Sequence, residues 1–488
     1  MLIMNKTLFL TICIISNLNS IVADNLIFPN KVIPSKLQVE YQKMETIGFI
    51  HFTVNTFTDR EWGYGNEDPK IFNPKKLDAK QWARIAKDGG LKELILTTKH
   101  HDGFCLWPSK YTEHSIKFCP YKNGNGDIVR EFVDACREYD LKIGFYLSPW
   151  DRNHKKYGTR DYVEYYKNQL EELLSLYGRI DEIWFDGANG GDGFYGGANE
   201  TREIYSKTYY DWDSIFKLVK KLQPEIMIFS DAGPDVHWIG NENGHAGETF
   251  WSTMDTDKVI IGNSDADYLN RGDKDGKNWV VGQCDVSIRP GWFYHSKEDN
   301  FVKTPQELID TYYKSVGRNA VLLLNLPPNN DGLICDKDAK NLLKFKSIID
   351  ETFENNLALE ADISATNYRE NGFDIRNILN DNLDSFWAVG DEVKSAELVF
   401  DFDQEVEFDR ILLQEPIHLG QRISKFCVEK QKNLKWERVY EGTTIGYKRL
   451  VRIPLVKASK IKISFLEANN TIAISKIGIF KASKDENI

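Results

Sequence analysis

Apolar runs and amphipathic segments alternate along the first two-thirds of the chain. The strand-like runs cover residues 45–55, 92–101, 141–151, 180–189, 225–235, 278–287 and 320–328. They are apolar almost throughout, which is typical of parallel strands that are covered on both faces. Seven such runs with helical segments between them predict an α/β fold, a (β/α)-barrel in which one strand has escaped recognition.

Helix boundaries support this alternation. Asp78 precedes an amphipathic segment that ends at Gly90, so the aspartate is expected to cap the helix and the glycine to end it. Thr304 precedes Pro305, and proline suits the first position of a helix because its missing N–H needs no partner there.

The pattern changes near residue 351. Beyond this point short strands with alternating polar and apolar residues are expected at 396–403, 408–416, 424–431, 448–455, 459–466 and 475–482. Helical periodicity is absent, so this part is predicted to be an antiparallel β-sandwich. The chain is therefore divided into residues 1–23, a barrel domain at 24–350 and a sandwich at 351–488.

The first 23 residues have the features of a secretory signal peptide. Lys6 precedes an apolar stretch at residues 8–15, and a polar segment then leads to the small residue Ala23. The apolar stretch is too short to span a bilayer, and no later segment is predicted to cross a membrane. We expect a protein exported to a periplasm or out of the cell.

Charge and composition narrow the function. The 488 residues include 62 Lys and Arg against 73 Asp and Glu, a formal net charge of −11. This acidic balance argues against nucleic acid as the main partner. Aromatic residues make up 12% of the chain, which suits either a large aromatic core or a sugar site with aromatic walls.

Polar side chains gather where the predicted strands end, and in a (β/α)-barrel these C-terminal ends form the active-site face. Six runs end in such residues, namely His51 and Asn55, His100 and His101, Tyr146, Trp150 and Asp151, Trp184 and Asp186, Asp231 and Asp235, and Asp285. Polar residues at the ends of one or two strands would be expected of any solvent-exposed loop. Polar residues at the ends of six strands, all at the same face of the barrel, predict a functional site there.

The segment KHHDGF at residues 99–104 is first considered as a metal site. A metal needs three or four converging ligands, and His51, Asp186 and Asp285 could complete a set with the histidine pair. Adjacent strand residues point to opposite faces, so both histidines converge only if the chain turns. No HExxH helix is present, and a metal is the less favoured interpretation.

A pair of carboxyl groups is the second hypothesis. Asp186 follows an apolar strand in WFDG, and a Gly-rich segment downstream supplies Glu242 and Glu248. Two carboxyl groups about 5–5.5 Å apart define a retaining glycoside hydrolase. The alternative for Asp186 is an ordinary helix cap. Neutral histidines fit sugar chemistry because they form hydrogen bonds with hydroxyl groups.

Longer motifs carry a resemblance to a known family. In order along the chain they are GFIHFTVNTF, EWGYGNEDPKIFNP, LTTKHHDGFCLWPSKYTEHSI, GFYLSPWD, EIWFDGANG and SVGRNAVLLLNLPP. Together they resemble the α-L-fucosidases of glycoside hydrolase family twenty-nine. The resemblance implies a barrel-like catalytic domain, a following β-sandwich similar to discoidin-like carbohydrate-binding modules, and retaining hydrolysis of terminal α-L-fucosides.

The resemblance also implies roles for individual residues. Asp186 matches the family's nucleophile, and Glu242 in WIGNENG matches the acid/base, with Glu248 as the alternate. The GNE segment is similar to the branch that acts on α-1,3/1,4-linked fucose. The substrate contacts implied are His51, Glu61, Trp62, His100, His101, Tyr146, Trp184, Arg289 and Trp292.

Two other functions stay open. One is a retaining glycosidase for another sugar on the same scaffold, and the other is a glycan-binding protein without catalysis. The expected partners are fucosylated glycans. No cofactor or catalytic metal is expected, a structural Ca²⁺ in the C-terminal domain is compatible with the resemblance, and the oligomeric state is left open.

Overall fold

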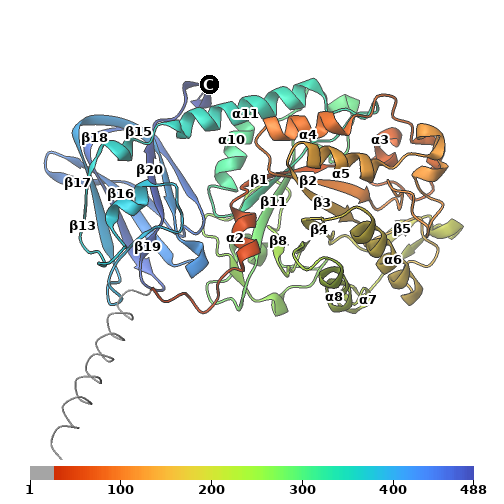
Figure 1. Cartoon of the computed structure of the whole chain (residues 1–488), viewed down its shortest axis with the longest axis horizontal. Helices are drawn as coiled ribbons and strands as arrows, with labels where there is room; N and C mark the ends of the chain where they lie inside the picture. The colour runs from red at the N-terminus through yellow and green to blue at the C-terminus, as the bar shows by residue number, and fades with distance from the viewer. Residues whose placement is uncertain (1–26, 488) are drawn as a thin grey trace, which may run out of the picture. The chain divides into compact units, whose positions relative to one another are not determined.

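The computed structural model describes residues 27–487, which form two compact units. One unit contains Pro34–Asn355 and residues 482–487, and the other contains residues 27–33 and Asn356–Lys481. Figure 1 shows the chain coloured from its N-terminus to its C-terminus. The predicted signal peptide at residues 1–23 lies outside the described residues. Within them, no helix has the length and apolar character needed to span a membrane.

The larger unit is a closed barrel of parallel strands, as the sequence predicts. In the order β1-β12-β11-β8-β7-β4-β3-β2, each strand pairs with the next and the last pairs with the first. The eight strands counted within residues 27–487 are β1 (Thr46–Ile50), β2 (Glu93–Lys99), β3 (Lys142–Leu147), β4 (Glu182–Trp184), β7 (Met227–Ser230), β8 (Val236–Trp238), β11 (Val281–Ser287) and β12 (Val321–Asn325).

The strand that escaped recognition is β8. It has three residues and follows β7 after a loop at residues 231–235, yet it pairs with β7 in parallel, with Phe229 opposite Val236. A parallel crossover usually needs a dozen or more residues and contains a helix. Because both strands are so short, the chain returns within this loop, and the sequence carries no helical signal to announce a new strand.

Helices surround the barrel strands (Figure 1). They are α2 (Lys36–Gln42), α3 (Val54–Thr58), α4 (Ala79–Asp88), α5 (Ile128–Glu138), α6 (Arg160–Leu176), α7 (Ser206–Tyr209), α8 (Trp212–Leu222), α9 (Ala266–Arg271), α10 (Pro305–Lys314) and α11 (Asp336–Glu354). Asp78 caps α4 by accepting from Lys80 N and Gln81 N, and Thr304 forms a capping box with Glu307. Both predicted helix starts are confirmed.

Short strand pairs lie in the loops between barrel strands. They are β5 (Gly191–Gly193) with β6 (Glu200–Arg202), and β9 (Thr253–Met254) with β10 (Asn278–Trp279). Both pairs are antiparallel.

The second unit contains an antiparallel sheet, again as predicted. Its strands are β13 (Asp362–Ala365), β15 (Ala396–Gln414), β16 (Ile423–Lys432), β17 (Lys435–Gly442), β18 (Arg449–Ala468) and β20 (Lys476–Phe480), and β14 (Trp387–Ala388) pairs with β19 (Ala473–Ile474). Trp387, Phe400, Phe408 and Phe465 are among its buried core residues.

Strand boundaries in this unit differ from expectation. The runs at 396–403 and 408–416 form the single strand β15, and those at 448–455 and 459–466 form β18. The two strands pair along most of their length, with register shifts between Asp401 and Val406 and between Phe408 and Arg410. The breaks expected between these runs are irregularities within continuous strands, because a bulge interrupts alternation without ending a strand.

Candidate active site

A cavity of about 110 Å³ opens at the C-terminal ends of the barrel strands. Barrels of this type carry their sites at this face because the loops that follow the strands converge there. The lining residues are Phe49, His51, Trp62, His100, His101, Tyr146, Trp184, Asp186, Ala188, Glu242, Asp285 and Trp292. Nine of the predicted catalytic and substrate-binding residues are therefore brought together in one pocket.

Both histidines of KHHDGF line this pocket. Strand β2 ends at Lys99, so His100 and His101 lie beyond the strand and are freed from its alternation. The chain then turns at Gly103, whose φ is +81°. A Cβ on this glycine would lie 2.4 Å from Oδ1 of Asp151. Glycine is thus required both for the backbone conformation and for the close approach of the next loop.

The Nδ1 atom of His51 is held by the protein. It lies 2.9 Å from Oδ1 of Asn325, and the Asn325 amide nitrogen donates to Ser287 Oγ and to the carbonyl of Trp292. The Asn325 oxygen is therefore the acceptor, and His51 Nδ1–H is the donor. In the neutral ring this leaves Nε2 as an acceptor for a ligand in the pocket.

His101 has the same arrangement. Its Nδ1 atom lies 2.7 Å from Ser148 Oγ, and the Ser148 hydroxyl donates to the carbonyl of Trp150 at 2.7 Å. His101 Nδ1–H is therefore the donor and its Nε2 the acceptor. In His100 the roles are reversed, because Asn55 Nδ2 donates to Nδ1 over 3.5 Å and Nε2 then carries the proton.

Burial keeps all three rings neutral. It lowers the pKa of His51 to about 3 and that of His101 to about 4, and it lowers the pKa of His100 well below its usual value. The pocket thus offers two ring nitrogens that accept hydrogen bonds and one that donates, a set matched to neutral hydroxyl groups.

Asp186 lies just beyond β4 at the base of the pocket, with 24% of its side chain exposed. Tyr146 donates to Oδ2 at 2.9 Å, and the backbone N–H of Ala188 donates to Oδ1 at 2.6 Å. His101 Nε2 lies 3.9 Å from the same Oδ2. These contacts fix the carboxyl group while leaving part of it open to a ligand.

An aromatic wall lies beside this carboxyl group. Trp184 stacks on Phe229 with ring centres 4.0 Å apart and on Tyr146 at 5.3 Å. The Trp184 indole donates to Oε1 of Gln283 below it, at 2.7 Å. With its N–H satisfied, the part of the indole that lines the pocket is apolar.

Glu242 lies at the exposed rim of the same pocket. It accepts from the indole N–H of Trp292 over 3.2 Å. Partial burial raises its pKa, and the negative charges of Asp186 and Glu61 raise it further against the opposing effect of the Trp292 hydrogen bond. Such an environment favours a carboxyl group that keeps its proton.

Glu248 lies outside the pocket. Its Oε2 atom is 2.7 Å from Arg318, and 54% of its side chain is exposed. It is therefore an exposed ion-pair partner, and Glu242 is the better fit to the second carboxyl group.

The barrel, its pocket and the following antiparallel sheet agree with what known proteins show. Residues 32–349 match the family model for alpha-L-fucosidase, and residues 362–478 match that of the F5/8 type C domain. Alpha-L-fucosidase 1 of Arabidopsis thaliana is 44% identical over 455 residues, which cover 92% of this chain and 87% of that protein. The chain belongs to the α-L-fucosidase family. It is a glycoside hydrolase, and its discoidin-like C-terminal domain is the one predicted.

Solved structures agree over nearly the whole fucosidase. A putative alpha-L-fucosidase from Bacteroides thetaiotaomicron is 40% identical with a TM-score of 0.87, covering 94% of this chain and 100% of that chain. A Ruminococcus gnavus glycoside hydrolase 29 family fucosidase in complex with fucose is 36% identical with a TM-score of 0.84, covering 95% and 97%.

Glu61 does not line the pocket of the fucosidase, unlike its neighbour Trp62. The Glu61 carboxyl group accepts from the backbone N–H groups of Trp292 and Phe293 and from His295 Nε2, at 2.6–3.2 Å. Its contacts hold the loop that carries Trp292. Of the predicted substrate contacts, Glu61 is therefore a residue that supports the pocket wall.

Arg289 also lies outside the pocket, which corrects the expectation of a substrate contact. Its guanidinium group forms a two-pronged pair with Asp338 at 2.7 and 2.9 Å and reaches Asp299 at 2.9 Å. The side chain is 1% exposed. Because its donors point to these carboxylates in the barrel wall, it anchors the start of α11.

Sequence reasoning missed part of the site. Phe49 and Ala188 line the pocket, and Asp285 was considered only as a strand-end residue or metal ligand. A second cavity of about 480 Å³ shares Trp184, Asp186, Ala188, Glu242 and Asp285 with the first, and is otherwise lined by Gly187, Asp231, Trp238, Gly262, Asn263 and Ser264. The signal for Asp285 was its place at the end of an apolar run, among five other such ends.

No metal site is evident at this face. Within residues 27–487, no group of three or more His, Cys, Asp or Glu side chains is arranged to hold a metal ion. The same residues offer no such group for a Ca²⁺ ion in the C-terminal domain.

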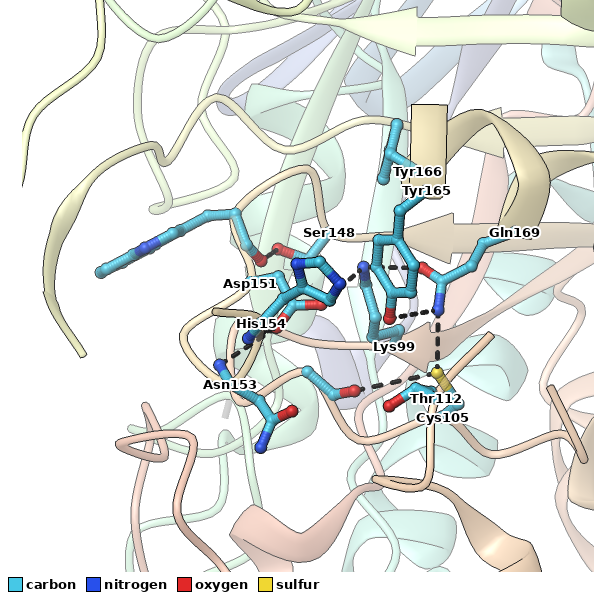
Figure 2. Close-up of polar contacts among 12 residues, drawn as sticks. Lys99, Cys105, Thr112, Ser148, Asp151, Asn153, His154, Tyr165, Tyr166 and Gln169 are labelled. Atoms are coloured by element: carbon cyan, nitrogen blue, oxygen red, sulfur yellow. Dashed lines mark hydrogen bonds and ion pairs between the residues drawn. The ribbon is translucent and has the colours of Figure 1, made fainter. Parts of the chain in front are cut away.

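A buried cation, Lys99, is the last residue of β2 (Figure 2). Lys99 is fully buried, and its ammonium group contacts Asp151 at 3.3 Å and Gln169 Oε1 at 2.9 Å. The rings of Tyr162, Tyr165 and Tyr166 lie 5.3–5.8 Å from it. Asp151 also accepts from the N–H groups of Asn153 and His154. The pair joins the ends of β2 and β3, the two strands that lead to His101 and Trp150.

Proposed function

We propose that the fucosidase is exo-acting and retaining, with Asp186 as nucleophile and Glu242 as acid/base. The observation that carries the proposal is that both carboxyl groups line one pocket, where burial and neighbouring negative charge raise the pKa of Glu242. Asp186 is fixed by Tyr146 and Ala188, whereas the pKa of Glu242 is raised by burial and by Asp186. Two carboxyl groups with different environments and different roles are what retention requires.

The reaction proceeds in two displacements. First, an oxygen of Asp186 forms a bond to the anomeric carbon while Glu242 gives its proton to the glycosidic oxygen, and the bond to the leaving group breaks. Water then attacks the same carbon, its proton passes to Glu242, and the bond to Asp186 breaks to release fucose. Two inversions leave the anomeric configuration unchanged.

The pocket chemistry matches fucose. The acceptor nitrogens of His51 and His101 suit two sugar hydroxyl groups, and the His100 N–H suits an oxygen that accepts. The apolar faces of Trp184 and Phe49 suit the methyl group of a deoxy sugar. A solved relative bears fucose by its printed description, which supports this choice of sugar.

We also propose α-1,3/1,4-linked fucose in branched oligosaccharides as the substrate. The anomeric carbon must lie between Asp186 and Glu242, and these residues also line the second, larger cavity. Because the second cavity starts where the scissile bond would lie, it has room for a leaving group of more than one sugar. The GNE segment around Glu242 supports the same linkage.

A linkage panel tests both proposals. Purified protein is incubated with α-1,2-, α-1,3-, α-1,4- and α-1,6-fucosylated oligosaccharides and with aryl fucosides and galactosides. Release of fucose from the 1,3- and 1,4-linked branched substrates is expected. Proton NMR at early times should show α-fucose as the first product, and β-fucose would exclude retention. Preference for galactosides, or glycan binding without release, would favour the alternatives.

Export is proposed as well, from residues 1–23. Sequencing the N-terminus of the mature protein tests it, with cleavage near Ala23 as the expected result and an intact Met1 as the opposing one. A structural Ca²⁺ in the C-terminal domain is tested by thermal unfolding with and without a chelator, where an unchanged midpoint would argue against it.

A further inference from the structure

A third carboxyl group belongs to the same site. Asp285 lies near the end of β11 and is 4% exposed. Its side chain lines both the sugar pocket and the second cavity, as do Asp186 and Glu242. Three carboxyl groups thus surround the place where the two cavities meet, although the double-displacement reaction uses only two of them.

Asp285 is positioned by two strands. Residues 283 and 285 of β11 point to the same side because strand side chains alternate with a period of two. Gln283 lies in the barrel interior, where it accepts from Trp184, so Asp285 stands one layer above it, at the pocket. The indole N–H of Trp238, on β8, donates to Oδ1 of Asp285 at 2.9 Å.

The other oxygen of Asp285 has no side-chain partner among residues 27–487. Within the same described residues, no Lys or Arg lines either cavity. The charged groups that share both cavities with it are Asp186 and Glu242, the titratable residues lining only the sugar pocket are His51, His100, His101 and Tyr146, and Asp231 lines only the second cavity. A buried carboxylate without a cation is costly, so this group lowers its free energy by holding a proton.

We propose that Asp285 is a neutral carboxyl group that donates a hydrogen bond from Oδ2 to a substrate oxygen at the junction of the two cavities. This inference rests on the proposed fucosidase site, since the junction is where the glycosidic bond would lie. Burial and the charge of Glu242 raise the pKa of Asp285 well above its usual value, with a further, smaller contribution from Asp186, against the opposing hydrogen bonds of its own backbone N–H and of Trp238.

The geometry fits this role because each oxygen of the Asp285 carboxyl group has a different function. Oδ1 accepts from Trp238, so the carboxyl group cannot turn freely, and the hydroxyl on Oδ2 is left to face the cavities. A donor fixed beside the reacting centre costs no reorganisation during the reaction, which is why such donors contribute strongly to rate.

Two substitutions separate a neutral donor from a charged group. Asp285→Asn keeps an oxygen for Trp238 and an N–H₂ donor for the substrate, whereas Asp285→Ala removes both. Asp127→Asn serves as the control: Asp127 has a raised pKa and caps α5 by accepting from Arg130 N, away from the cavities. Asparagine caps a helix as well as aspartate.

The loss of kcat/KM on a fucosylated trisaccharide should be much smaller for Asp285→Asn, which keeps a donor, than for Asp285→Ala, which should lower it by about 10²- to 10³-fold, as expected for loss of one preorganised donor. The alkaline limb of the pH–rate profile should be the same in Asp285→Asn and wild type. A neutral group replaced by a neutral group leaves the pKa of Glu242 unchanged.

Two results would overturn the proposal. If Asp285 is ionised, Asp285→Asn removes a negative charge near Glu242, lowers the pKa of Glu242 and moves the alkaline limb to lower pH. If Asp285→Ala retains full activity, the side chain does not touch the substrate. Should the alanine variant fail to fold, the pH profile of Asp285→Asn still decides. Wild-type protein that releases no fucose from any substrate would instead refute the proposed function.

Discussion

The two sides of the β2 and β3 ends are both polar and both buried, yet they are built differently. On the pocket side, His100, His101 and Tyr146 each use part of their hydrogen-bonding capacity within the protein. On the outer side, Lys99 and Asp151 satisfy each other within a shell of amide, backbone and aromatic groups (Figure 2).

This difference shows how residues that bind a ligand can be distinguished from residues that stabilise the barrel. Burial alone does not distinguish the two sides, since Lys99 is 0% and His101 2% exposed. What distinguishes them is whether polar atoms are left without a protein partner and face a cavity. Protein structures satisfy nearly all buried polar groups, so open groups that line a pocket indicate a ligand.

The largest expected effect is on the pocket side, at Asp186. Asp186→Asn keeps an oxygen to accept from Tyr146 or Ala188, so the fold should be retained, but the amide cannot act as nucleophile. We expect kcat/KM on an aryl fucoside to fall by about 10⁴-fold or more, as for other nucleophile variants. Kinetics with the purified variant and an unchanged thermal unfolding curve check this, and a variant with a tenth of wild-type activity would contradict it.

The next effect separates the two glutamates. Glu242→Ala should lower kcat on substrates with a poor leaving group by about 10²- to 10⁴-fold, the range for a lost general acid. Added azide should restore turnover on an activated aryl fucoside, because this anion needs no general base: it bonds to the anomeric carbon of the fucosyl-enzyme, the bond to Asp186 breaks, and fucosyl azide is released. Glu248→Ala is the matched control, and it should behave as wild type because Glu248 lies outside the pocket and its exposed side chain forms an ion pair with Arg318.

The barrel and the sandwich could be predicted from the sequence. Because barrel enzymes carry their sites at the C-terminal ends of the strands, most of the site could be predicted as well. Asp186 and the histidine pair follow strong apolar runs, so their positions at strand ends could be predicted from the sequence. The orientation of the His100 and His101 side chains could not be predicted, because it depends on where β2 ends and on the turn at Gly103.

Other features depend on contacts between distant segments. Arg289 was expected in the pocket, but its partner Asp338 lies 49 residues away on α11, and no local pattern indicates that pair. Strand β8 was missed because three residues carry too little periodicity. Trp238, which lies on this strand, and the second cavity, which Trp238 lines, were therefore not predicted either. The division of roles between Glu61 and Trp62 likewise depends on the loop at residues 291–295.

On the outer side, the expected effect is on stability. Lys99→Met leaves the Asp151 carboxylate buried without a cation, and breaking a buried pair in this way costs about 3–5 kcal/mol. The free energy of unfolding, measured in urea, should fall by that amount while activity per folded molecule changes little.

The double variant Lys99→Met/Asp151→Asn sharpens this test. It removes both charges but keeps an oxygen to accept from the N–H groups of Asn153 and His154. Much of the lost stability should return, because a buried pair replaced by neutral groups is far less costly than a single unpaired charge. A double variant less stable than Lys99→Met would show that Asp151 is not the group left uncompensated.

The smallest expected effect concerns pH on the pocket side. His51 and His101 have pKa values of about 3 and about 4, lowered by burial, so their acceptor nitrogens stay unprotonated well below neutrality. The inhibition constant of L-fucose should therefore change less than about twofold from pH 7 to pH 5 and weaken only near pH 4. In the unfolded chain both rings take up protons near pH 6.5, so the folded state binds fewer protons below that pH and the free energy of unfolding should fall from pH 6.5 toward pH 4. His101→Gln should reduce the slope of the free energy of unfolding against pH by the equivalent of about one proton. The fucose measurement has its own opposing outcome: binding that already weakens between pH 7 and pH 6 would mean that the rings are charged and act as donors.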